Sequence, residues 1–107
     1  MAQTFNDLIK NYCGLDPTDD SYDAIFSSSL ASSLLKISQQ SSTFTVPDEK
    51  VTLETTLDSL GFADPFSPYP EFICINAQLA FDPPASAQVM NAYKDELAEL
   101  SFRMSVM

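Results

Sequence analysis

The sequence predicts a mainly α fold, a small helical bundle of about four to five helices with a long C-terminal helix and an extended mid-chain loop. Two observations predict it. Apolar residues recur at steps of three and four over several segments, which is the period of one helix face. Proline or glycine separates these segments, at places where helices end. The 107 residues, 45% of them hydrophobic, are enough for a single domain over 1–107.

Two helices are predicted in the first part of the chain. Thr4 is a suitable N-cap for a short helix over 4–12, and Gly14 a suitable stop after it. A second helix is predicted over 21–39, because aspartates precede it and its apolar positions follow the helical period. Those positions are Tyr22, Phe26, Leu30, Leu34 and Ile37, with Ile25 and Leu35 widening the stripe.

The other face of the second helix is rich in serine, with eight serines between positions 27 and 42. One interpretation is a solvated helix face that runs into a loop. The other is close packing against a neighbouring subunit, because small side chains let two helices approach each other. The sequence does not decide between them.

The middle of the chain is predicted to be mostly irregular. Residues 40–51 form a loop, within which 43–46 alternate like a strand but are too few for a sheet. A short helix is predicted over 52–60, capped by Thr52. Three prolines within 64–70 then exclude regular structure.

Two further helices are predicted around a proline corner. Residues 70–81 are apolar almost all round, which fits a central helix or a buried strand; the length and the proline at position 70 favour a helix. Pro83 and Pro84 end it, and a helix over 85–104 follows, with apolar positions at Met90, Tyr93, Leu97, Leu100 and Met104. The two helices are expected to pack antiparallel and to bury each other, with Leu97 and Leu100 in the contact.

Charge disfavours several classes of partner. Fifteen acidic and five basic residues give a net charge of −10, which repels phosphate backbones and anionic lipids. No apolar run approaches the roughly 20 residues of a membrane span. Because the N-terminus has no signal-peptide pattern, synthesis and retention in a cytosol are expected.

Catalytic chemistry has few candidates. The chain has no histidine, and Cys13 and Cys74 are too far apart in sequence for a CxxC motif, so we expect two free thiols, no metal site, no cofactor and no enzymatic activity. The acids Asp16, Asp19, Asp20 and Asp23 lack the spacing of a calcium loop, and helix capping explains them better.

One block of residues carries a family resemblance. It begins with Phe81-Asp82-Pro83-Pro84, continues through Ser86, Val89, Ala92, Asp95-Glu96-Leu97 and Glu99-Leu100, and ends with Phe102-Arg103-Met104 and Val106. With Gly14–Asp23 and Phe44-Thr45-Val46, it resembles a family of tailed-phage head–tail connectors, also called head-completion adaptors. The chain departs from that pattern where relatives carry tryptophan, at Phe102 and near Leu57, and where they have a glycine-containing loop, at 38–43.

The resemblance implies a structural protein of the virion neck, assembled in the host cytoplasm. Such subunits form a ring of about twelve copies. The ring binds the portal protein and the next neck or tail-completion protein, extends the DNA channel with DNA only as passing cargo, and has no membrane partner.

Two sets of contact residues are predicted on this basis. The portal or partner contact comprises Phe102, Arg103, Met104, Val106 and Met107. The contact with a ring neighbour comprises Ser28, Ser32, Phe44, Val46, Asp48 and Lys50.

Two alternative functions stay open. The first is an acidic DNA mimic that inhibits a nucleic-acid enzyme, because the net charge is strongly negative. The second is an acyl carrier, because Asp58-Ser59-Leu60 matches the tripeptide that bears the phosphopantetheine arm in that family. Gly61 and the prolines after it argue against the long helix that a carrier serine begins.

Overall fold

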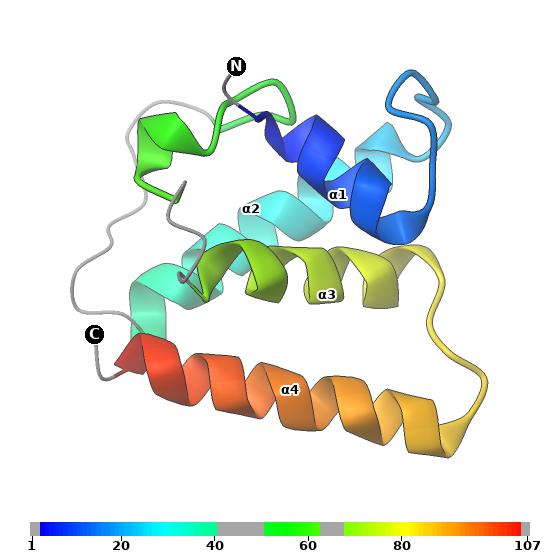
Figure 1. Ribbon diagram of the computed structural model, residues 1–107, viewed down its shortest axis with the longest axis vertical. Coiled ribbons are helices and arrows are strands. Elements are labelled where there is room, and N and C mark those ends of the chain that lie inside the picture. The colour runs from blue at the N-terminus through cyan, green and yellow to red at the C-terminus, as the bar shows by residue number, and fades with distance from the viewer. Residues whose placement is uncertain (1–2, 41–50, 63–67, 106–107) are drawn as a thin grey trace.

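The computed structural model describes residues 3–40, 51–62 and 68–105, and within these ranges the fold is the predicted helical bundle (Figure 1). Its elements in chain order are α1 (Phe5–Cys13), α2 (Asp23–Gln40), the 3-10 helix η1 (Asp58–Leu60), α3 (Tyr69–Phe81) and α4 (Ala87–Ser105). The described residues form no β-strand, and their one β-bridge joins Thr4 to Thr56.

Helix α3 is the centre of the bundle. It packs against α1, α2 and α4, and α1 and α4 lie on opposite sides of it (Figure 1). A nearly continuous apolar run makes this possible, since its buried residues point in every direction around the helix axis. They are Tyr69, Phe72, Ile73, Cys74, Ile75 and Ala77. The segment left open between helix and strand is therefore a helix, which begins at Tyr69, between two prolines, and ends at Phe81, with Asp82 as its C-cap.

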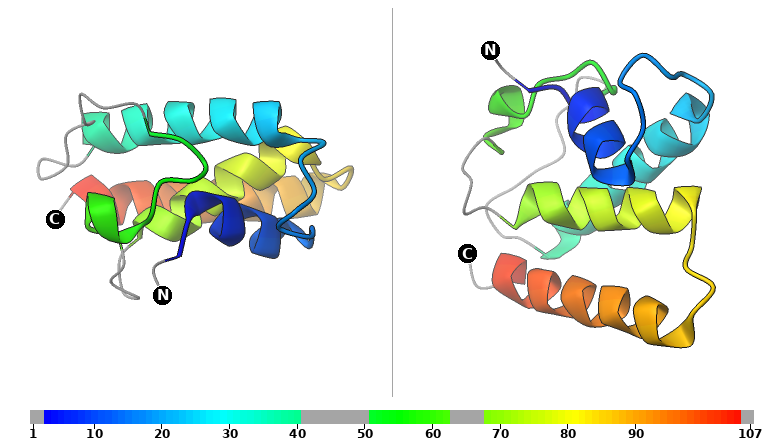
Figure 2. Two further views of the ribbon diagram at one scale, coloured as in Figure 1. Left: turned by 90° about the horizontal axis from the view of Figure 1, so that it is seen from above. Right: turned by 45° about the vertical axis from the view of Figure 1, so that its right-hand side comes forward.

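Helix α2 packs closely against α3, and Figure 2 shows it on a different side of α3 from α1. Its buried apolar residues are Phe26, Leu30, Leu34 and Ile37, four of the five positions that the periodicity predicts. The fifth, Tyr22, precedes the helix and is 38% exposed. The wider stripe is a correction, because Ile25 and Leu35 are 40% and 55% exposed. Both lie outside the face of α2 that carries its buried residues.

Helix α1 has the ends that its sequence predicts. The Asp7 N–H donates to Thr4 Oγ1 at 3.2 Å. Gly14 adopts φ 76°, a left-handed conformation that suits glycine, and its N–H donates to the carbonyl of Asn11. Phe5 and Ile9 are fully buried against the rest of the core.

The helix predicted over 52–60 is wrong for most of its length. Thr52 and Thr55 form a turn, in which the Thr52 N–H donates to Thr55 Oγ1 at 3.0 Å. The carbonyls of Leu53 and Thr55 accept hydrogen bonds from the start of α1, at 2.8 and 3.1 Å. In a helix those carbonyls would accept hydrogen bonds from N–H groups of the same segment. Because they bind the start of α1 instead, only the three residues of η1 are helical.

Helix α4 runs antiparallel to α3 after the Pro83-Pro84 corner (Figure 1), and its fully buried residues lie near its C-terminus. Leu100 and Met104 are its buried residues, while Leu97 is half-buried. The mutual burial expected of α3 and α4 is therefore partial, because α1 and α2 cover much of the surface of α3.

A lysine lies within the core between α1 and α2. Lys10 is 2% exposed, and its Nζ lies 2.8 Å from the Asp23 carboxylate and donates to the Pro17 carbonyl at 3.3 Å. One ammonium group thereby ties α1, the following turns and the start of α2. Burial of a charge requires such partners.

We expect Lys10→Ala to lower the free energy of unfolding by about 2 kcal/mol, because it removes the ammonium that pairs with Asp23. The cost should stay below that of a fully buried pair, since the Asp23 side chain is 42% exposed. Urea denaturation measures it. The control is Arg103→Ala, which breaks the exposed Glu99–Arg103 pair and should cost less than about 0.5 kcal/mol. Equal costs for the two variants would contradict the role of Lys10.

We expect Leu100→Ala to cost about 2–5 kcal/mol, because its side chain is fully buried where α4 meets the bundle. Leu97→Ala should cost clearly less, since Leu97 retains solvent contact. Thermal unfolding of both variants compares them directly. A larger loss for Leu97→Ala would show that α4 packs differently from the structure.

Candidate interaction surfaces

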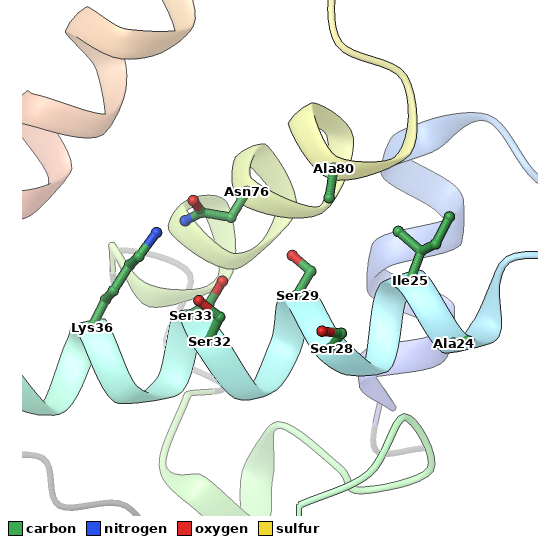
Figure 3. A pocket seen from close by; sticks show the side chains of 9 residues that line it. All are labelled: Ala24, Ile25, Ser28, Ser29, Ser32, Ser33, Lys36, Asn76 and Ala80. Carbon is green, nitrogen blue, oxygen red and sulfur yellow. The ribbon is translucent and has the colours of Figure 1, made fainter.

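An open groove runs between α2 and α3, and the serine-rich face of α2 forms one wall of it (Figure 3). Its volume is about 490 Å³. The lining residues are Ala24, Ile25, Ser28, Ser29, Ser32, Ser33, Lys36, Asn76 and Ala80. We call this feature the serine groove. Because the side chains are small, the backbone of α2 is open to close approach by another chain.

Two of the six residues predicted to contact a ring neighbour lie in the serine groove. Ser28 and Ser32 line it and are exposed. The other four, Phe44, Val46, Asp48 and Lys50, lie outside the described residues. Ser28 and Ser32 therefore lie on the same surface, the wall of the serine groove.

The groove contains an unsatisfied buried hydroxyl. Ser33 is 1% exposed, and its Oγ has no hydrogen-bond partner among the described residues. The nearby Asn76 uses its side-chain N–H to donate to the Phe72 carbonyl at 2.8 Å. A buried hydroxyl without a partner costs about 1–3 kcal/mol, so Ser33 is an unsatisfied polar position in the wall of the groove.

Lys36 stands at one end of the groove, beside Asn76 (Figure 3). Lys10 and Arg103 each pair with a carboxylate, whereas Lys36 has no carboxylate partner within the described ranges. The groove thus combines small polar side chains with an available positive charge in an otherwise acidic protein.

The C-terminal end of α4 forms a second surface. Phe102 is 66% exposed, and beside it Arg103 pairs with Glu99 one helical turn earlier. An exposed aromatic residue next to an arginine has the composition of an interface anchor.

The predicted portal contact needs one correction and is incomplete in the structure. Met104 is fully buried in the core and is unavailable to a partner in this conformation, because it lies on the face of α4 that packs inward. Val106 and Met107 lie outside the described residues. Phe102 and Arg103 are therefore the exposed part of this set.

Acidic side chains face each other where α3 meets α4. Burial, and then the nearby negative charge of Glu96, raises the pKa of the Glu71 carboxyl. Glu99 adds to the increase, and Arg103 opposes it. At neutral pH these like charges repel each other across the α3–α4 contact.

The thiols are poorly suited to nucleophilic chemistry. Both cysteines are free, and burial raises the pKa of the Cys74 thiol to about 12. Burial also raises the pKa of Cys13, and the thiolate is the reactive form of a cysteine. Burial and the nearby Tyr93 raise the pKa of Tyr12 to about 12.

Metal-binding groups and membrane-spanning helices have no candidate in the described part of the chain. Residues 3–40, 51–62 and 68–105 contain no group of histidine, cysteine and acidic side chains placed to hold a metal ion. Within the same ranges, none of the helices has the length and apolar character of a membrane span. Asp16 and Asp19 accept hydrogen bonds in the turns before α2, where backbone N–H groups of Thr18 and Ser21 lower their pKa values.

The serine of the carrier-like tripeptide has a local structural role. Ser59 Oγ donates to the Thr56 carbonyl at 2.7 Å, within the short helix η1 that Gly61 ends. The position thus lacks the long helix that begins at the modified serine in acyl carriers.

Sequence reasoning missed the α3 wall of the groove and the role of Lys36. Asn76 and Ala80 interrupt an apolar helix with small or polar side chains, four residues apart and so on one face. That spacing was a usable signal. The position of Lys36 on the serine face, four residues after Ser32, was another.

A family model described as "Phage connector protein" matches residues 7–107 of this chain. The match covers both surfaces and all four α-helices except the first two residues of α1. The searches of curated proteins and of solved structures returned no match.

We expect Glu71→Gln to raise the melting temperature at pH 7. A carboxyl whose pKa is raised by folding binds its proton more tightly in the folded state, so stability falls as pH rises above its unfolded pKa of about 4.3. The advantage of the variant should shrink as pH falls towards that value. Thermal melts at several pH values measure this. Glu54→Gln, a change of an exposed carboxylate in the 51–62 segment, is the control. An advantage that persists undiminished at pH 3.5 would contradict the assignment.

Proposed function

Because the chain belongs to the phage connector protein family, a group of structural virion components, we propose that it forms a ring between the portal and the tail components. Copies of the subunit would line and extend the DNA channel, and the next neck or tail-completion protein would bind the far side of the ring. The proposed site of action is the neck of the virion, after assembly in the host cytoplasm.

The observation that carries the proposal is the presence of two different exposed surfaces on one small bundle. The serine groove lies between α2 and α3, whereas the Phe102–Arg103 surface lies at the end of α4. A ring subunit needs one surface for its neighbours and another for the protein above or below it. We assign the serine groove to the ring neighbour and the Phe102–Arg103 surface to the portal.

The charge of the protein supports the role of a channel. With a net charge of −10, a ring wall would repel the phosphate backbone and would not retain DNA as it passes. A DNA-binding protein needs the opposite charge balance. Passage without binding is what a conduit requires.

The test is the affinity for the portal protein encoded with this chain. Phe102→Ala combined with Arg103→Ala should weaken binding at least tenfold, which corresponds to about 1.4 kcal/mol, because exposed aromatic and arginine anchors dominate interface energies. Biolayer interferometry measures the dissociation constant. Since Phe102 is largely exposed, the melting temperature of the free protein should change little.

The matched control for this test is Leu35→Ala, a truncation of another large apolar residue, 55% exposed on α2. It should leave portal binding unchanged. Removal of residues 106–107 tests the rest of the predicted contact. If neither the double variant nor this truncation alters binding, the C-terminal end of α4 is not the portal anchor.

A further inference from the structure

The serine groove has the chemistry of a binding site for an acidic helix. Its buried Ser33 hydroxyl has no partner among the described residues, and Lys36 at its end has no carboxylate partner there. A carboxylate on a docking helix can accept a hydrogen bond from the exposed Lys36 ammonium. The groove therefore favours an occupant with a small side chain for the serines and a carboxylate for Lys36.

The first half of α4 presents such a surface on the same molecule. Gln88, Ala92 and Asp95 are exposed, and their spacing of four and three residues places them on one face. That face points away from Leu100 and Met104, the buried residues of α4. Ala92 supplies the small side chain, and Asp95 supplies the carboxylate.

We propose that the serine groove of one copy receives the first half of α4 from a second copy. Asp95 of one subunit pairs with Lys36 of its neighbour, and Ala92 packs against Ser32. This inference rests on the proposed ring, for which it names the two surfaces that meet.

The spacing of the two helices supports this register. Lys36, Ser32 and Ser28 lie along α2 with intervals of four residues, and Asp95, Ala92 and Gln88 lie along α4 with intervals of three and four. Both sets span about two helical turns. If the helices pack in parallel, the three pairs come into contact in order.

Charge identifies a second copy as the occupant. The chain has a net charge of −10, so a second copy supplies many carboxylates. Because two such copies repel each other, a contact between them needs one of the five bases to offset the repulsion. Because the groove and the α4 face are different surfaces, the contact is head-to-tail. Such contacts close into rings, whereas a contact of one surface with itself ends at a dimer.

The first experiment measures association of the free protein by sedimentation velocity from micromolar to millimolar concentration. The wild-type protein should associate as concentration rises. Ser32→Trp blocks the groove and Ala92→Trp blocks the α4 face, so each variant should associate at least tenfold more weakly. Ser27→Trp and Ala98→Trp are the matched controls on other faces of α2 and α4, both exposed, and should behave like the wild type.

An equimolar mixture of Ser32→Trp and Ala92→Trp gives the sharper result. The first variant retains its α4 face and the second retains its groove, so the mixture should form a 1:1 dimer that grows no further. A mixture that stays monomeric while the wild type associates would overturn the proposal, as would a wild type that stays monomeric at millimolar concentration.

A charge exchange provides the second arm and avoids bulky side chains in case a tryptophan variant fails to fold. Lys36→Glu and Asp95→Lys should each weaken association at least tenfold, and the two changes in one chain should restore it. Absence of rescue in the folded double variant would exclude the Lys36–Asp95 pair.

The outcomes separate this inference from the proposed function. Portal binding without dimerisation of the mixed variants would place the ring contact elsewhere and leave the connector role intact. A 1:1 dimer in the mixture without any portal binding would support the head-to-tail contact and remove the portal role.

Discussion

The burial of α3 on several sides is the constraint on which the rest of the structure depends. This helix carries few polar residues, and α1, α2 and α4 each cover part of its surface. A helix that is apolar all round is stable in water only when neighbours cover it. Among the helices that the structure describes, α3 alone has this character, and it lies at the centre with the other three packed around it.

This arrangement leaves α4 only partly covered. Since α1 and α2 occupy much of the surface of α3, α4 buries only Leu100 and Met104 fully, and Tyr93 and Leu97 pack against the core in part. The carboxylates of Glu71 and Glu96 at the same contact add repulsion. The first half of α4 thus keeps an exposed face, and α3 also leaves room beside α2 for the serine groove. Both surfaces are exposed because three helices pack around α3 and each covers only part of it.

The parts of the fold that sequence predicted are those set by periodicity. The buried positions of α2 repeat at helical intervals, and the prolines at positions 70, 83 and 84 mark the limits of α3 and the corner before α4. The features that the sequence did not predict depend on contacts between distant segments. The helix predicted over 52–60 is lost because its carbonyls pair with the start of α1, and Lys10 is buried because Asp23 and Pro17 lie near it only after folding.

The same distinction applies to the candidate surfaces. The serine-rich face of α2 was visible in the sequence, whereas the opposing wall from α3 was not. That wall turns a row of small side chains into a groove, in which the buried Ser33 hydroxyl has no partner among the residues that the structure describes. In a protein of charge −10, non-specific association is opposed by repulsion at every approach. In the proposed head-to-tail contact a base, Lys36, meets a carboxylate, and this pairing offsets the repulsion at one defined place on each copy.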